Sequence, residues 1–333
     1  MPVKYDDPAV EPAIENEKEL TQEIISLINR IQDHNFSMHR HGFRGTHVKV
    51  QGIVKGYLIV PKLPDELAHG ICAKPAAYDV ALRYANEPSF LQDDRTPGPR
   101  GCAMRIFSEP VQDLTFNNAP ILELRDMPTT VEIFRIRERH FREPEKIADE
   151  LKQRTDKDLQ MAPTQLPNKH FLSYTMYSQS AYRWGPYVVK YALFPTANVP
   201  ETNVDQSSDP EQHSKWLKDY FADNEMTYDL RIQLCEDVEK QSVEDASVEW
   251  NEEQFPFRTV GKVVLPKQDS FNPTRRSFWD DRMKLNVWAG SDQHRPLGSV
   301  NRLRKNLYEE SQKKRADLND AELLRVTTIE QMP

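Results

Sequence analysis

The sequence predicts an α+β fold, in which an antiparallel β-barrel has helices before and after it. Several short segments alternate apolar and polar residues, as half-buried strands do. Loops separate these segments, and helical stretches lie between and after them, which favours a barrel with helical additions. Only 11 glycines occur in 333 residues and none form G-x-G-x-x-G, so no phosphate-binding loop of that type is predicted.

The N-terminal part is expected to be an arm followed by one helix. Residues 1–14 look like a flexible arm, and residues 15–34 read as an amphipathic helix. Its apolar face consists of Leu20, Ile24, Ile25, Leu27, Ile28 and Ile31. We therefore divide the chain into an arm and helix over residues 1–35 and a barrel domain over residues 36–333, which ends in a C-terminal helix.

The barrel domain is expected to alternate strands and helices. Strands are predicted from Thr46 onwards and over residues 102–107, 112–116, 171–179, 187–194, 228–235 and 260–265, whereas residues 73–86 suit strand or helix. Helices are predicted over residues 128–142, 144–152, 212–223 and 301–315. The arginine-rich run 135–142 alternates with Glu and apolar residues, and we interpret it as a solvated helix face.

Composition restricts the class of protein. The net charge of −8 favours neither nucleic acid nor an anionic membrane surface as a partner. Three scattered cysteines form no disulfide framework or zinc motif. No signal-peptide core and no run of about 18 apolar residues is present. These features predict an intracellular, cytoplasmic protein with no transmembrane segment, and they leave homo-oligomerisation open.

The C-terminal helix carries an unusual polar stripe. Arg304, Tyr308, Ser311 and Arg315 are spaced i, i+4, i+7 and i+11, so they share one helix face. An arginine one turn from a tyrosine favours the phenolate, and a phenolate can be the axial ligand of ferric haem. The second arginine could pair with a haem propionate. The alternative is a solvated helix surface, where such spacing is common.

Histidines gather in one segment, at His34, His39, His41 and His47. A non-haem metal site is one interpretation, but neither H-x-x-x-H nor a clear facial triad is visible. Surface histidines are the second interpretation. The third assigns a role to His47 alone, in the element Arg44-Gly45-Thr46-His47 at the start of a strand.

These elements resemble the catalase superfamily, and most closely its small members of the coral allene oxide synthase type. In catalases an R-x-x-H element supplies the distal catalytic base, and Arg44 and His47 match it. Further elements match in the same order over roughly residues 40–316, and they are Leu82-Arg83-Tyr84-Ala85, residues 100–107, residues 113–120, Arg125-Asp126, Arg304-x-x-x-Tyr308 and Arg315.

The resemblance implies a catalase-like antiparallel β-barrel that encloses haem b. It makes Tyr308 the ligand of the haem iron, with Arg304 beside it, and it assigns Arg44, Arg83 and Arg315 to the propionates. The distal residues are His47 as acid–base group and Asn117 as hydrogen-bonding group.

Two departures from large catalases point to the allene oxide synthase branch. Thr46 stands where large catalases have Val, and Ala85 stands where they have Ser. We treat Thr46 as a third distal residue that influences the choice of peroxide.

The expected function is that of a haem-dependent hydroperoxide-processing enzyme. It would act on organic, lipid-type hydroperoxides by cleavage, dehydration, isomerisation or peroxidase chemistry. One alternative is a small catalase that disproportionates hydrogen peroxide. A second alternative is a haem-binding protein without turnover.

Overall fold

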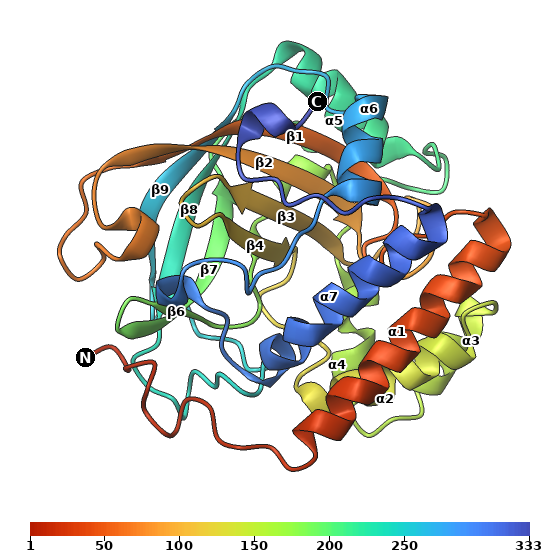
Figure 1. Cartoon of the computed structure of the whole chain (residues 1–333), viewed down its shortest axis with the longest axis horizontal. Helices are drawn as coiled ribbons and strands as arrows, with labels where there is room; N and C mark the ends of the chain where they lie inside the picture. The colour runs from red at the N-terminus through yellow and green to blue at the C-terminus, as the bar shows by residue number, and fades with distance from the viewer.

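The computed structural model describes residues 1–333 and contains a closed eight-stranded antiparallel β-barrel (Figure 1). The barrel strands are β1 (Val50–Val60), β2 (Ala76–Asn86), β3 (Arg100–Ile106), β4 (Gln112–Asn117), β5 (Met176–Tyr177), β7 (Tyr187–Pro195), β8 (Met226–Leu234) and β9 (Phe257–Leu265). Their order is β5-β4-β3-β2-β1-β9-β8-β7, and pairing of β5 with β7 closes the ring. A ninth strand, β6 (Tyr182–Trp184), pairs with β7 and lies outside the ring.

Side chains fill the barrel interior. Because successive residues of a strand point to opposite faces, the even-numbered residues of β2, β3 and β4 point inward. Most of their apolar members belong to a core cluster of 34 buried residues, which includes Leu82, Tyr84, Met104 and Phe116. The odd-numbered residues of the same strands point outward, and a helical layer covers this outer face.

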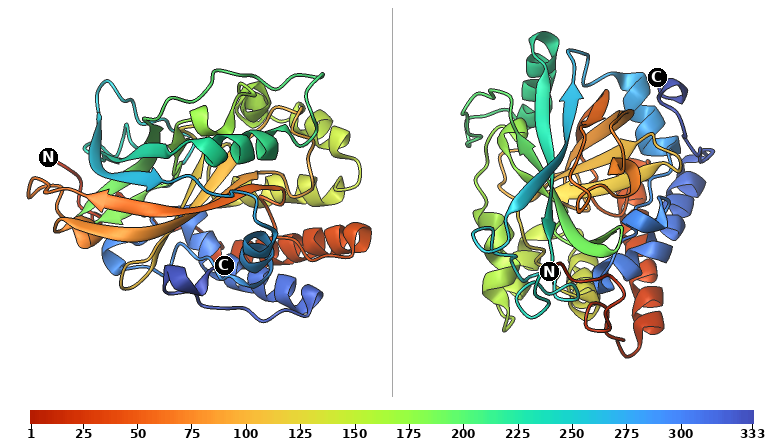
Figure 2. Two further views of the ribbon diagram at one scale, coloured as in Figure 1. Left: turned by 90° about the horizontal axis from the view of Figure 1, so that it is seen from above. Right: turned by 90° about the vertical axis from the view of Figure 1, so that its left-hand side faces the viewer.

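Three long helices form that layer: α1 (Glu17–His39), α2 (Met127–Arg139) and α7 (Ser299–Asn319). Figure 2 shows α1 and α7 together on one side of the barrel. α1 packs against both α2 and α7. Apolar residues of all three helices form a second core, which includes Ile24, Ile28, Val131, Phe134 and Val300.

The remaining helices are short, and they are α3 (Pro144–Leu151), α4 (Lys157–Met161), α5 (Gln212–Asp223) and α6 (Pro273–Ser277). None of the helices has the length and apolar character needed to cross a membrane. The start of α2 is fixed by Asp126, whose Oδ1 accepts a hydrogen bond from the Thr129 N–H at 2.8 Å. Asp126 thus acts as an N-cap, which is a typical stabilising position for Asp.

Most predicted elements are confirmed. Strands occupy the four predicted positions 102–107, 112–116, 187–194 and 228–235 within one to two residues at each end, and 260–265 is the C-terminal part of β9. The ambiguous segment 73–86 is a strand, β2. The predicted helix 212–223 is present with the same bounds, as α5.

Three expectations about local structure are wrong. Residues 1–14 are docked, because Val10 is buried and the Val3 N–H donates to the Cys235 carbonyl at 2.7 Å. The first strand begins at Val50 rather than Thr46. Residues 171–179 contain a 3₁₀ turn and only the two-residue strand β5, because Met176 and Tyr177 alone pair with the neighbouring strands β4 and β7.

Candidate active site

A cavity of about 390 Å³ lies between the outer face of the barrel and the helical layer. Its floor is formed by adjacent rows of β2, β3 and β4, in which Ala85, Gly101 and Asn117 are neighbours, as are Arg83, Ala103 and Thr115. Most of these side chains are small, which leaves free space between the strands and the helical layer. We call this floor, together with His47, the distal wall. α7 forms the opposite side, which we call the proximal wall.

The structure brings all nine predicted site residues to this one cavity, and they are Arg44, Thr46, His47, Arg83, Asn117, Arg304, Tyr308, Ser311 and Arg315. They come from the loop before β1, from β2 and β4, and from α7. The cavity therefore depends on packing of the C-terminal helix α7 against β2 and β4, which are distant from it in sequence.

His47 has an unusual backbone conformation that places it in the cavity. Its φ is 55°, in the left-handed region that non-glycine residues seldom adopt. Two hydrogen bonds hold this turn: the His47 N–H donates to the Glu87 carbonyl at 2.7 Å, and Arg83 Nη2 donates to the His47 carbonyl at 2.9 Å. The turn interrupts strand alternation, so Thr46 and His47 can both line the cavity. Such local strain is frequent at functional sites.

The His47 ring lies directly against β3. A Cβ atom at Gly101 would be only 2.2 Å from His47 Cε1, so a larger residue at this position would displace the ring. Burial lowers the pKa of His47 to about 4. The imidazole is therefore neutral near pH 7 and able to accept a proton.

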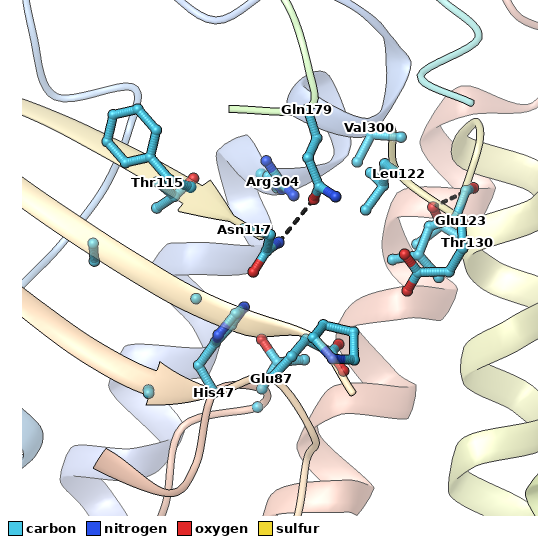
Figure 3. A pocket seen from close by; sticks show the side chains of 18 of the residues that line it. His47, Glu87, Thr115, Asn117, Leu122, Glu123, Thr130, Gln179, Val300 and Arg304 are labelled. Atoms are coloured by element: carbon cyan, nitrogen blue, oxygen red, sulfur yellow. Dashed lines mark hydrogen bonds between the residues drawn. The ribbon is translucent and has the colours of Figure 1, made fainter. Parts of the chain in front are cut away.

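Asn117 faces His47 across the floor, and Gln179 holds it in place (Figure 3). Asn117 Nδ2 donates to Gln179 Oε1 at 2.8 Å, and Gln179 Nε2 donates in turn to the Ile121 carbonyl. Gln179 also has a left-handed backbone, with φ at 61°. Asn117 Oδ1 is buried and has no hydrogen-bond partner. It is thus available to a ligand.

Three arginines meet at one end of the cavity around a single carboxylate. Arg83 Nε lies 2.8 Å from Asp280 Oδ1, and Arg44 Nε lies 3.7 Å from the same oxygen. Arg315 is 2% exposed, and its one hydrogen bond is a 3.5 Å contact with the Met283 carbonyl. Burial lowers the pKa of Arg315 to about 10. Burial and the charges of Arg315 and Arg83 lower the pKa of Arg44 well below its usual value.

This cluster has more positive than negative charge. Three guanidinium groups lie around Asp280, and Asp281 also acts on Arg315. The Nε atoms of Arg44 and Arg315 are buried without a hydrogen-bond partner. Buried charges without partners are costly. The arrangement therefore fits an anionic ligand.

On the proximal wall, Tyr308 is half-buried and lines the cavity. Arg304 Nη1 donates to Asn301 Oδ1 at 3.1 Å, and no hydrogen bond joins Arg304 to Tyr308. Ser311 Oγ donates to Gln32 Oε1 at 3.2 Å, which fastens α7 to α1. The predicted stripe thus faces the cavity, while two of its members also have structural contacts.

The four clustered histidines do not form one site. His34 contacts Glu138 at 3.3 Å, and His41 contacts Asp281 at 3.0 Å. His39 packs edge-on against Phe43. No group of three or more His, Cys, Asp or Glu side chains is arranged to hold a metal ion.

A buried charged group on the distal side was missed in the sequence. Glu87 and Glu123 both line the cavity, and Arg137 bonds to each of them. We interpreted the run containing Arg137 as a solvated face, and for this residue that is wrong. Arg137 follows the buried Phe134 by three residues, so the two share a helix face. That spacing was the available signal.

Comparison with known proteins yields matches at the level of structure. No protein-family model and no curated protein matches the sequence. A fungal catalase matches with a TM-score of 0.69 and 19% identity, over 85% of this chain and 61% of that chain. Catalase A from Saccharomyces cerevisiae matches with a TM-score of 0.69 and 18% identity, over 85% of this chain and 63% of that chain. The protein has a catalase-like fold. A bacterial catalase also matches, with a TM-score of 0.63 and 16% identity, over 93% of this chain and 63% of that chain.

The catalase-like fold confirms the fold that the sequence motifs implied. The chain spans 61–63% of the length of these three catalases. At 16–19% identity the likeness establishes the fold and leaves the reaction to be argued from the residues. The comparison with allene oxide synthase stays a prediction.

Proposed function

We propose that this catalase-like protein binds haem b in the cavity and processes hydroperoxides. The observation that carries the proposal is the cluster of three arginines, which lies in the same cavity as His47 and Asn117. Arg44, Arg83 and Arg315 with Asp280 have a net charge of about +2, and haem b has two propionates. The donor set on α7 contains Tyr308, the ligand type by which catalases hold haem iron.

When bound, haem would supply a ferric iron at which the O–O bond of a hydroperoxide is cleaved. The protein residues then divide the remaining tasks. Tyr308 would hold the iron. His47, neutral at pH 7, would accept the hydroperoxide proton and return it to the leaving oxygen. Asn117 uses one Nδ2–H to bond to Gln179, and its second Nδ2–H would donate a hydrogen bond to a peroxide oxygen.

Organic hydroperoxides are the first substrate class that we propose. Apolar side chains line the helical side of the cavity, and they include Phe134, Leu159, Pro163 and Leu166. Such walls stabilise apolar substituents. Disproportionation of hydrogen peroxide is the second candidate, favoured by the catalase-like fold. Haem binding without turnover is the third, and the neutral His47 next to Asn117 argues against it.

The deciding experiment is the absorption spectrum of the haem-loaded protein during rapid mixing. Consumption of a lipid hydroperoxide, followed by loss of its conjugated-diene absorbance, would support the first candidate. Oxygen evolution from hydrogen peroxide would support the second. A haem spectrum that neither peroxide changes would support the third, and absence of any haem binding would contradict the proposal.

We also propose an intracellular location. Cys72, Cys102 and Cys235 are all buried and free, as expected where thiols stay reduced. Self-association into a homo-oligomer is part of the same proposal and can be measured by light scattering.

Replacing Arg315 with Leu should weaken haem binding by about 10- to 100-fold. Hydrogen bonds to charged groups contribute about 1.5–3 kcal/mol, and each 1.4 kcal/mol is tenfold in affinity. The measurement is a haem titration followed by absorbance. Lys313→Leu is the matched control, because Lys313 is exposed on the same helix. Equal affinities of the two variants would contradict a propionate role for Arg315.

Replacing Thr46 with Val should raise oxygen evolution from hydrogen peroxide by up to about tenfold. The Thr46 hydroxyl can hydrogen-bond a water or peroxide in the cavity and so compete with a second peroxide. Val has nearly the same shape without the hydroxyl, and one hydrogen bond contributes about 0.5–1.5 kcal/mol. An oxygen electrode at matched haem concentrations measures the effect. If the variant evolves oxygen no faster, Thr46 does not set the choice of peroxide.

A further inference from the structure

Two glutamates line the distal side of the cavity. Glu87 follows β2 directly, and Glu123 lies between β4 and α2. Their side chains are 12% and 10% exposed, respectively. Figure 3 shows Glu87 beside His47 and Glu123 farther along, next to Thr130. A substrate that approaches His47 along this side would therefore pass both carboxyl groups.

Arg137 supplies the positive charge that pairs with both glutamates. Arg137 Nη1 lies 2.9 Å from Glu87 Oε1, and Arg137 Nη2 lies 3.4 Å from Glu123 Oε1. Arg137 does not line the cavity itself, so the carboxyl groups stand between it and a substrate. Because one guanidinium group is shared by two carboxyl groups, it has no excess positive charge that could pair with a substrate carboxylate.

Burial and the neighbouring charges determine the protonation of Glu87 and Glu123. Burial alone would raise the pKa of Glu87, but the charge of Arg137 lowers it below the ordinary value. Burial and the charge of Glu87 raise the pKa of Glu123. The group Glu87–Arg137–Glu123 is therefore neutral or negative, depending on the proton of Glu123, and it is not positive at any pH at which Glu87 is ionised.

The other cations of the cavity are assigned elsewhere. Arg44 and Arg83 converge on Asp280, and Arg315 lies with them, where we propose the haem propionates. The charge of Arg304 also acts on His47, but Arg304 lies on the opposite, proximal wall, where we propose that it pairs with the Tyr308 phenolate. A substrate carboxylate close to the distal wall would lose its hydration and meet carboxyl groups of the protein, and both effects are unfavourable.

We propose that the Glu87–Arg137–Glu123 group makes the enzyme select uncharged hydroperoxides over hydroperoxides that carry a carboxylate. This inference rests on the proposed function and specifies its substrate class. Hydrogen peroxide, alkyl hydroperoxides and esterified lipid hydroperoxides are uncharged and would be accepted. A free fatty-acid hydroperoxide would be disfavoured whenever its carboxylate enters the cavity.

The test compares one fatty-acid hydroperoxide with its methyl ester, on the haem-loaded full-length protein at pH 7.5 and below the micellar concentration. We expect kcat/KM for the ester to exceed that for the acid by at least about tenfold, which corresponds to about 1.4 kcal/mol. The matching hydroxy acid and hydroxy ester lack the O–O bond. Their equilibrium binding, measured by competition, gives the same comparison without turnover.

The double variant Glu87→Gln, Glu123→Gln is the more decisive experiment, because it leaves the Arg137 guanidinium without a carboxylate partner. The preference for the ester should then shrink or reverse. Glu23→Gln is the matched control. Glu23, on α1, bonds at 2.6 Å to Arg135, which lies on the same helix as Arg137 but at the surface, so the preference should not change.

Two results would overturn the inference: equal kcat/KM for acid and ester in the parent protein, or an unchanged preference in the double variant. If neither hydroperoxide reacts, the proposed function fails. The hydroxy pair then decides the inference by itself, since equal binding of the acid and the ester contradicts it and tighter binding of the ester supports it.

Discussion

Replacing Tyr308 with Phe should abolish stable haem binding. The phenol oxygen is the only group of the substituted residue that can ligate iron, and Phe keeps the ring that packs against the barrel core. Removing partners that merely support metal ligands already costs about 10- to 100-fold in affinity. Loss of the ligand itself should therefore exceed about 100-fold. Haem titration, followed by the absorbance of the ferric protein, measures the change.

Tyr187→Phe is the matched control for this variant. Tyr187 is also half-buried and packed against the barrel core, but it lies outside the cavity. It should bind haem as the parent does. A Tyr308→Phe protein with full haem occupancy and an unchanged ferric spectrum would remove Tyr308 from the iron and would require another ligand on the cavity wall.

Replacing His47 with Ala should leave haem bound but slow the reaction with hydroperoxide by about 10²–10⁴-fold, the range that general acid–base groups contribute. The reason is that no other neutral base among the predicted residues faces Asn117 across the floor. Single-turnover mixing separates this effect from product release. The haem absorbance reports occupancy in the same experiment.

His41→Ala is the control, because His41 contacts Asp281 and does not line the cavity. Reaction of the His47 variant at the parent rate would assign the base to another residue. The pH profile gives an independent readout. Since burial lowers the pKa of His47 to about 4, protonation removes the base only as the pH falls towards 4. The parent rate should accordingly stay constant down to about pH 5.

Several strands could be predicted because their signal is local. Residues 228–235 alternate apolar and polar side chains, and in the structure alternate residues of β8 fill the barrel. By contrast, β5 has only two residues, too few for any periodicity, yet it closes the barrel by pairing with both β4 and β7. Closure is a contact between distant segments, so no window of sequence contains it.

The part of the site that lies on one helix could be predicted, because it consists of particular residue types at short sequence spacing. The stripe Arg304, Tyr308, Ser311 and Arg315 needs only helical periodicity to share a face, and that face does line the cavity. The residues that complete the site gave no such signal. Gln179 lies two residues after β5 and bonds to Asn117 at a sequence separation of 62, and Asp280 bonds to Arg83 at a sequence separation of 197.

By itself, therefore, the sequence determined the fold class and identified side chains that line the cavity, because both depend on the pattern and type of residues within single segments. Tertiary structure decided how those side chains are used. The left-handed turn at His47 is held by the Glu87 carbonyl and Arg83, and Arg137 turns inward because two glutamates from other segments meet it there. These features depend on hydrogen bonds and charge pairs between segments, which form only when the helical layer packs on the barrel.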